Sequence, residues 1–376
     1  MQFFMPTRVI KNFSGDAIFN KVAADNFLII SSHSAAEVSG ALDDVSQALK
    51  EIGASFLYDN SITPNPTVQS IDHLQDKYQS KSISGIISIG GGSVIDAAKV
   101  LSLCLANNIN CSQLLEVDYS QFPKLPHISI PTTCGTGSET SKGAILSNYE
   151  NEWKGGVRGE NIFCDVAVLE PKYLSSLSLE LYLSTGFDAI SHAIETYVSK
   201  ASSPMTKKLS FAALDLLVPA LVKLASHGDK AFLTLKDKED LLLGSCFAGM
   251  NLANSSTCLP HRLQYCIGAI TDTAHVDGVA LLYPAWVKNL RQNKVISLAE
   301  INKYLAHLQP ELQSTEPILD LLDLLAMKKE ASDLGVSYAM KDKLISLASG
   351  TLDLDPGYLG AQTIEQIFEE TLTCKQ

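Results

Sequence analysis

The chain has 376 residues, a length typical of two ordinary domains that can each bury a core. Hydrophobic residues make up 46% and charged residues 19% of it, proportions that exclude an intrinsically disordered protein. Its formal net charge of −12 argues against nucleic acid or an anionic membrane as a partner, because both require a basic face.

The sequence also predicts where the protein works. We find no apolar stretch that approaches the roughly 20 residues of a membrane span, and no apolar signal-peptide core near the N-terminus. We therefore expect a cytoplasmic protein with no membrane partner. Its eight cysteines are scattered without a CxxC pair, so we interpret them as reduced thiols, not as a disulfide framework.

In the first half of the chain, short apolar runs alternate with helical stretches. Helices are expected over 35–52 and from a turn at 64–66 to about 79. Strands of this continuous apolar type, separated by helices, predict a parallel sheet covered on both faces. The expected strands are 27–32, 55–58, 85–89, 127–130 and 166–169.

After Pro171 the strand signals fade and helical patterns take over. Ser203-Pro204 predicts the start of a long apolar helix, which Pro219 should kink. Further helices are expected over 236–250 and from 317 to about 329. We therefore predict an α/β domain over 1–175, followed by an all-α domain over 176–376.

A glycine-rich turn, Gly90-Gly-Gly-Ser93, lies between an expected strand and an expected helix. Glycines let the backbone approach a ligand closely, and the N–H groups of a helix start attract phosphate. The turn is not the GxGxxG dinucleotide fingerprint, so a tight strand-to-helix turn with no ligand is the alternative.

A second loop makes a nucleotide site more specific. The segment 131–139, Pro-Thr-Thr-Cys-Gly-Thr-Gly-Ser-Glu, follows another expected strand and is rich in hydroxyl groups. Loops at the carboxyl ends of parallel strands converge on one crevice, which is where open α/β sheets bind ligands. Two such loops favour a phosphate-binding cradle over an ordinary turn.

Four side chains form a possible metal site. Asp188 and His192 are four residues apart, which places them about 5–6 Å from each other on one helical face. With His261 and His275 they would supply a full ligand set for a divalent transition metal. The alternative is a hydrogen-bonded core histidine and an aspartate that complements a helix dipole.

These motifs together resemble the iron-containing (group III) alcohol dehydrogenase family, which has a dehydroquinate synthase-like fold. The resemblance rests on 90–99, 131–139, 186–195 and the spaced pair His261 and His275, in that order along the chain. It implies an N-terminal α/β domain with a parallel sheet, an all-α C-terminal domain and, commonly, a homodimer.

The resemblance also assigns roles to residues. It implies that Asp188, His192, His261 and His275 bind one Fe²⁺ or Zn²⁺. Hydride would then pass between NADH or NADPH and the carbon of an aldehyde or primary alcohol whose oxygen the metal polarises. The residues implied at the cofactor are Gly91, Gly92, Ser93, Thr132, Thr133, Thr136 and Lys154.

The chain departs from the family pattern at several positions. Tyr265 stands where many members have a histidine suggested as a proton relay, so we take Tyr265 and the ligand His275 as candidate catalytic residues. Ser32 stands where members that prefer NAD have an acid. Without that acid a 2′-phosphate is not repelled, and this favours NADPH. Glu170-Pro171 replaces a usual Asp-Pro.

Basic and polar residues near the motifs raise the question of substrate. Arg262 and Gln264 could face an anionic or polyhydroxylated substrate, or Arg262 could lie on a helix surface, and Lys142 has the same ambiguity. A biosynthetic reductase of an aldehyde bearing a phosphonate or carboxylate and a simple ethanol-type enzyme are equally expected. A rival function is that of a sugar-phosphate cyclase or lyase of the dehydroquinate synthase type. The Asp at 188, where such enzymes have Glu, and the few basic residues near the motifs speak against it. A non-catalytic nucleotide-binding relative is a third possibility.

Overall fold

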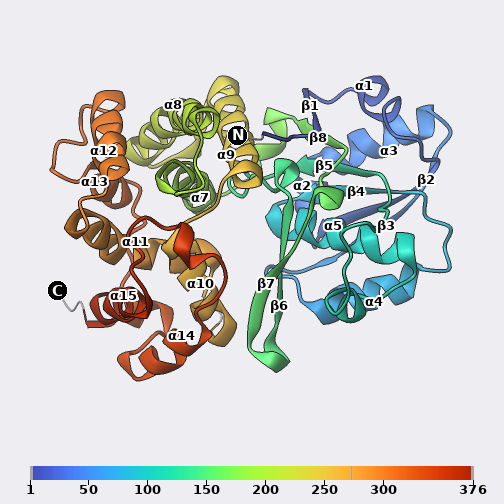
Figure 1. Ribbon diagram of the computed structural model, residues 1–376. Coiled ribbons are helices and arrows are strands. Elements are labelled where there is room, and N and C mark those ends of the chain that lie inside the picture. Colours follow the sequence, from blue (N-terminus) through green and yellow to red (C-terminus); the bar gives the residue numbers. More distant parts are fainter. Residues whose placement is uncertain (1–2, 272, 374–376) are drawn as a thin grey trace.

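The computed structural model describes residues 3–271 and 273–373. Its first half contains a six-stranded, all-parallel sheet with the strand order β1-β8-β5-β4-β2-β3 (Figure 1). The parallel sheet expected from the apolar runs is therefore present. The strands of the sheet are β1 (Arg8–Lys11), β2 (Asn26–Ser32), β3 (Ser55–Ile62), β4 (Gly85–Gly90), β5 (His127–Pro131) and β8 (Val166–Leu169).

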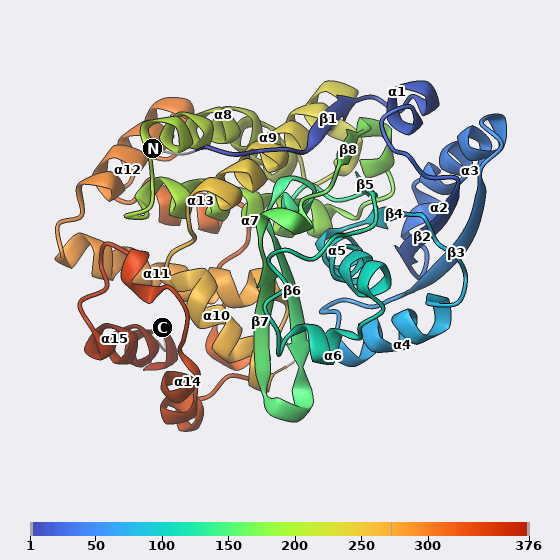
Figure 2. The same cartoon turned by 45° about the vertical axis from the view of Figure 1, so that its right-hand side comes forward.

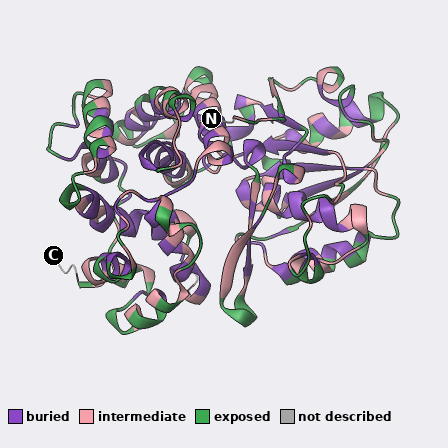
Figure 3. Cartoon of the chain, viewed as in Figure 1, coloured by how far each residue is buried: buried purple, intermediate pink, exposed green. Residues whose placement is uncertain are grey.

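Helices cover both faces of this sheet. Phe27 and Ile29 of β2 pack toward one group of helices, α1 to α3, and the alternate residues Leu28 and Ile30 pack toward α4, α5 and α6. Both faces are consequently buried, as the purple strands of Figure 3 show. The helices are α1 (Gly15–Phe19), α2 (Ala35–Val38), α3 (Ala41–Glu51), α4 (Val68–Tyr78), α5 (Gly92–Asn107) and α6 (Cys111–Leu114).

Three expected elements have clearly different bounds in the structure. The helix expected from 317 to about 329 ends at Leu324. The helix predicted over 35–52 is interrupted at Gly40, whose φ of 78° lies in the left-handed region that favours glycine. The strand predicted over 55–58 extends to Ile62 because β3 continues to pair with β2.

A two-stranded antiparallel hairpin, which the sequence analysis did not predict, lies outside the main sheet. It consists of β6 (Gly143–Asn148) and β7 (Trp153–Arg158). Figure 2 shows it reaching down between α10 and the helices of the α/β half. Glycines and polar residues interrupt its apolar pattern. Strand β1 was missed as well because only two of its four residues, Val9 and Ile10, are apolar.

The second half is helical, and among its described residues no strand follows Leu169. The helix predicted from Pro204 continues through Pro219 without interruption. Nine helices are assigned among the described residues of this half: α7 (Leu179–Val198), α8 (Pro204–His227), α9 (Leu235–Asn254), α10 (Leu259–Ile270), α11 (His275–Gln292), α12 (Ile296–Leu308), α13 (Pro317–Leu324), α14 (Lys341–Leu347) and α15 (Ala361–Thr373).

Helix α8 is long and apolar enough to cross a membrane, which differs from the expectation that no segment would be. Half of its apolar window is buried inside the protein. Leu214, Leu217 and Leu221 belong to the core that α8 shares with α7 and α9. Its composition is therefore that of a core helix.

Candidate metal and nucleotide site

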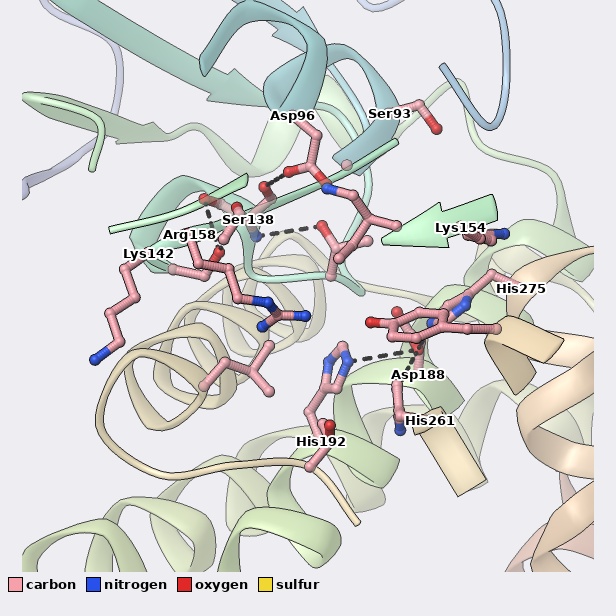
Figure 4. Close-up of a pocket in the computed structure, with 18 of the residues that line it drawn as sticks. Ser93, Asp96, Ser138, Lys142, Lys154, Arg158, Asp188, His192, His261 and His275 are labelled. Atoms are coloured by element: carbon pink, nitrogen blue, oxygen red, sulfur yellow. Dashed lines mark hydrogen bonds and ion pairs between the residues drawn. The ribbon is translucent and has the colours of Figure 1, made fainter. Parts of the chain in front are cut away.

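A cavity of about 250 Å³ lies where the α/β half meets the helical half. Its walls come from the turn between β4 and α5, the hairpin, and helices α7, α10 and α11 (Figure 4). Both halves of the chain thus contribute side chains to one space, as expected for a ligand site between domains.

The four predicted metal ligands come together in this cavity. Asp188 and His192 lie one turn apart on α7, His261 lies in the first turn of α10, and His275 is the first residue of α11. Asp188 Oδ1 is 3.8 Å from His192 Nε2, 3.5 Å from His261 Nε2 and 3.8 Å from His275 Nε2. One ligand atom from each of the four lies within 4.8 Å of the others.

This arrangement fits a divalent transition metal. Ligand atoms about 2.1 Å from a tetrahedral ion lie about 3.4 Å apart, close to the separations between Asp188 Oδ1 and the imidazoles. Asp188 Oδ1 and His261 Nε2 are also buried without a hydrogen-bond partner among the described residues. Buried polar atoms are costly when unpaired, and a bound cation would satisfy both of these.

Two further side chains orient the histidines. Glu195 Oε1 lies 2.7 Å from His261 Nδ1, and Gln264 Oε1 lies 2.7 Å from His275 Nδ1. Each contact places the proton on Nδ1 and leaves Nε2 facing the site as a lone-pair donor. Glu195 is held in turn by the N–H of Cys258, which donates to Oε2.

The sequence analysis missed these orienting roles, although a signal existed for one of them. Glu195 is seven residues after Asp188, so two helical turns put it on the same face of α7. Gln264 is fully buried and hydrogen-bonded to His275, so it does not face a substrate as the sequence analysis suggested.

Three of the four ligands have protonation states that suit metal binding. Burial lowers the pKa of His192 to about 4 and that of His275 to about 3, so both imidazoles are neutral near pH 7. Burial acts to raise the pKa of Asp188, but the neighbouring histidines hold it well below its ordinary value. Burial acts to lower the pKa of His261, but the charge of Glu195 raises it to about 10, so metal binding must displace a proton there.

The two predicted phosphate-binding loops meet beside the metal ligands. Helix α5 begins at Gly92, and a Cβ atom there would lie 2.4 Å from Cγ2 of Thr136. A Cβ at Gly91 would lie 3.1 Å from Cγ2 of Thr133. Only glycine allows the loops to approach this closely while the start of α5 stays open to a ligand.

Not every residue assigned to the cofactor reaches the cavity. Gly92, Ser93 and Thr136 line it, whereas Gly91 and Thr133 support the turn from behind. Thr132 is buried, and its N–H donates to the carbonyl of Gly90. Ser32 ends strand β2, outside the cavity lining.

A buried lysine fixes the second loop in place. The Nζ of Lys99 has no exposed surface and donates to Ser138 Oγ, to the carbonyl of Ser141 and to that of Gly143. One helical turn earlier on α5, Asp96 accepts hydrogen bonds from Ser138 Oγ and from the N–H of Ile145. The loop and the start of the hairpin are therefore bound to α5.

Lys154 and Tyr265 both line the cavity. Lys154, on β7, donates a hydrogen bond of 3.1 Å to Asn65 Oδ1. The ring of Tyr265 is stacked beside that of the ligand His275, with the ring centroids 6.2 Å apart. The two candidate catalytic residues are therefore neighbours.

The same cavity has more positive side chains than the sequence analysis expected. Lys142 and Arg262 line it, and so does Arg158, at the end of the unpredicted strand β7. Arg262 lies on the cavity side of α10, where its guanidinium donates to Ser256 Oγ at 2.9 Å. It is not a solvent-facing helix residue.

Sequence comparisons identify the family. A sequence model of iron-containing alcohol dehydrogenases matches residues 14–171, and a model of the C-terminal part of these enzymes matches residues 182–372. The chain belongs to the iron-containing alcohol dehydrogenase family. It is therefore an oxidoreductase of the alcohol dehydrogenase type.

Similar proteins support this membership. The 4-hydroxybutyrate dehydrogenase of Clostridium kluyveri is 28% identical over 283 residues, which cover 74% of each chain. The long-chain-alcohol dehydrogenase 1 of Geobacillus thermodenitrificans is 28% identical over 75% of this chain and 70% of its own. The crystal structure of an iron-containing alcohol dehydrogenase from Thermotoga maritima superposes with a TM-score of 0.85, at 26% identity and over 99% of both chains.

Proposed function

We propose that this chain is a metal-dependent alcohol dehydrogenase that uses NADH or NADPH and works chiefly as an aldehyde reductase. The observation that carries the proposal is the meeting of four ligand atoms within 4.8 Å of one another, in the cavity that Ser93 and the start of α5 also line. A metal and a nucleotide could then act on one substrate.

In the proposed reaction, the metal and the nicotinamide would supply the reactive groups, and the protein would align them and exchange a proton. When bound, Fe²⁺ or Zn²⁺ supplies Lewis acidity at the substrate oxygen and the nicotinamide supplies or accepts hydride. The protein's own residues align these groups: Glu195 and Gln264 hold His261 and His275 with Nε2 toward the site. Tyr265 has a phenolic hydroxyl in the cavity, and we assign it the exchange of a proton with the substrate oxygen.

We propose NADPH as the preferred cofactor. Strand β2 ends in Ser31 and Ser32 and is followed by His33, so its end has no carboxylate of its own to repel a 2′-phosphate. A cytoplasmic location and a homodimeric state also stay predictions.

One observation bears on the rival cyclase function. Four basic residues, Lys142, Lys154, Arg158 and Arg262, line the cavity, so basic groups are not as few as the sequence suggested. Family membership nevertheless favours the dehydrogenase, as does Asp188 in the position where such cyclases have glutamate.

The deciding experiment joins metal analysis to an activity screen. We expect the purified protein to contain Fe or Zn and to oxidise NAD(P)H when aldehydes are added. His261→Ala should lose both the metal and at least 1,000-fold in kcat/KM, roughly what loss of an essential metal's charge stabilisation would cost. His73→Ala, on the exposed face of α4, is the matched control and should keep both. Retention of metal and full activity by His261→Ala would refute the proposal.

A further inference from the structure

One wall of the cavity carries positive charge that the metal and nucleotide do not require. Lys142 lies between the second loop and β6, Arg158 ends β7, and Arg262 lies on α10. In Figure 4, Lys142 and Arg158 stand on the side of the cavity away from Ser93 and Lys154. This wall is thus separate from the turn that is suited to a pyrophosphate.

These cations have no carboxylate partner among the described residues. No ion pair or side-chain hydrogen bond is formed by Lys142 or Arg158, and Arg262 bonds only to Ser256. The Nε atom of Arg262 is buried and unpaired within the part of the chain that the structure describes. A buried guanidinium N–H without an acceptor is costly, so a ligand with negatively charged oxygens would be favourable here.

The acids of the cavity form no ion pair with this wall among the described residues, although Asp96 lies close enough to interact with the charge of Arg158. Asp96 accepts hydrogen bonds from the N–H of Ile145 and from Ser138 Oγ, and Asp188 belongs to the metal ligands. Arg158 and Arg262 both line this cavity and carry like charges, so the two guanidinium groups repel each other. A bound anion would relieve that repulsion.

The chemistry of the wall selects a type of anion. A guanidinium group presents N–H donors in a planar fork that matches two oxygens of a carboxylate or phosphonate. The hydroxyl-bearing residues Ser255, Ser256 and Thr257 line the cavity beside Arg262 and can complete the contacts. A cavity of about 250 Å³ that must also admit a nicotinamide leaves room for a short substrate only.

We propose that Arg158, together with Arg262 and Lys142, binds the anionic tail of the substrate. The substrate is then a short aldehyde or alcohol that carries a carboxylate or phosphonate at the end remote from its reacting carbon. This inference rests on the proposed reductase function and names the substrate class of the same site.

The test compares matched substrates of the metal-loaded enzyme. We would measure kcat/KM for succinic semialdehyde, for the phosphonate aldehyde of equal length, and for neutral butanal. We expect at least one anionic aldehyde to be favoured over butanal by about 100-fold or more, and the better of the two identifies the tail. Arg158→Gln should lower this preference by about 10- to 100-fold, the usual effect of losing hydrogen bonds to a charged group.

Variants separate the wall from general effects of charge. Arg158→Lys keeps the positive charge but lacks the planar N–H donors of a guanidinium group, so it should retain part of the preference for anionic aldehydes over butanal. Arg8→Gln removes the same charge from exposed strand β1 outside the cavity and should leave the preference unchanged. Equal kcat/KM for all three aldehydes in the unmodified enzyme, or an unchanged preference in Arg158→Gln, would overturn the proposal. The proposal would also be overturned if Arg158→Gln raised the KM for NAD(P)H as much as it lowered the preference for anionic aldehydes, because the wall would then bind the cofactor.

A binding measurement keeps this inference distinct from the reductase proposal. The enzyme cannot reduce succinate or 3-phosphonopropionate. Calorimetric titration of the metal-loaded protein with these anions therefore measures their affinity for the wall without turnover. We expect at least one to bind and to bind at least tenfold more weakly to Arg158→Gln. Binding without any aldehyde reduction would refute the reductase function alone, whereas reduction of butanal without anion binding would refute the anionic wall alone.

Discussion

At the scale of single residues, the proposed metal site depends on the two side chains that hydrogen-bond to its histidines, Glu195 and Gln264. His261 and His275 each present Nε2 because a buried acceptor, Glu195 or Gln264, holds the opposite nitrogen. Those acceptors lie on the same helices as other ligands, so the helices that bring the ligands together also align them.

Replacement of Glu195 by glutamine should weaken metal binding. The glutamine keeps an acceptor oxygen for His261 Nδ1 but loses the negative charge that increases the ligand's basicity, so we expect 10- to 100-fold lower affinity for Zn²⁺. Competition with a chromogenic chelator measures it. Unchanged affinity would show that the Glu195 charge has no part in metal binding.

The cofactor preference also depends on one residue. Ser32→Asp would place a carboxylate at the end of β2, where it would repel a 2′-phosphate and accept hydrogen bonds from ribose hydroxyls. We expect kcat/KM for NADPH to fall at least tenfold relative to that for NADH. Steady-state kinetics with both cofactors check this, and an unmodified enzyme that strongly prefers NADH would contradict the premise.

At this scale the sequence indicated part of the proposed metal site, because the i,i+4 spacing of Asp188 and His192 is local information and both side chains line the same cavity. The distant pair His261 and His275 has no local geometry, and only the resemblance to a family joined it to α7. Arg158 could not be assigned from sequence because its strand was not recognised, so nothing placed it beside the cavity.

At the scale of elements, β3 and α4 are joined by a buried carboxylate. Asp59 is 4% exposed and accepts hydrogen bonds from Lys77 Nζ at 2.7 Å and from the Tyr78 hydroxyl at 2.8 Å. Burial acts to raise the pKa of Asp59, but these hydrogen bonds and those from Ser61 lower it to about 2.

This shift predicts a dependence of stability on pH. A carboxyl group whose pKa is lower in the folded chain than in the unfolded chain, about 3.9, stabilises the fold above that pH. We expect the contribution, about 2 kcal/mol, to be lost as the pH falls from about 4 through 2. Asp59→Asn should be less stable at pH 7 and lose less stability on acidification. Thermal melts of both proteins from pH 7 to pH 2 would show the difference, and parallel curves would contradict it.

Elements were predicted in proportion to the strength of their local pattern. The strands β2, β4, β5 and β8 are almost entirely buried and mainly apolar, and all four were found. The hairpin β6–β7 mixes glycine and polar residues because it lies outside the main sheet with much of its surface only partly buried (Figure 3). Its stability comes from tertiary contacts with α5 and α10, which local sequence does not encode.

At the scale of the whole molecule, the two halves touch closely at a pair of glycines, Gly137 and Gly249. A Cβ at Gly249 of α9 would lie 2.1 Å from the carbonyl oxygen of Gly137 in the second loop. Nearby, Thr140 Oγ1 donates to the carbonyl of Cys246 at 3.0 Å. This contact sets how far the phosphate-binding loop stands from the metal-binding helices.

Gly249→Ala should therefore force the halves apart. We expect a loss of about 1–3 kcal/mol in stability from overpacking, and up to 100-fold in kcat/KM because the metal and nucleotide sites would be misaligned. Thermal unfolding and aldehyde-dependent NAD(P)H oxidation measure the two effects. Lys236→Ala, on the exposed first turn of α9, is the control and should change neither. Wild-type activity in Gly249→Ala would show that this contact does not set the alignment.

The hairpin β6–β7 forms a sheet of its own, so its residues can change in evolution independently of the main sheet. Metal ligands come from three helices and the phosphate cradle from two loops of the main sheet, while Arg158 comes from a short ribbon encoded by 16 consecutive residues, 143–158. Because the ribbon pairs with none of the six strands, residues around Arg158 can change without altering the parallel sheet, provided that Lys154 and the contacts with α5 are kept. New substrate preferences can thus arise from substitutions in one short segment of the chain, while the proposed metal ligands and the two loops of the main sheet stay unchanged.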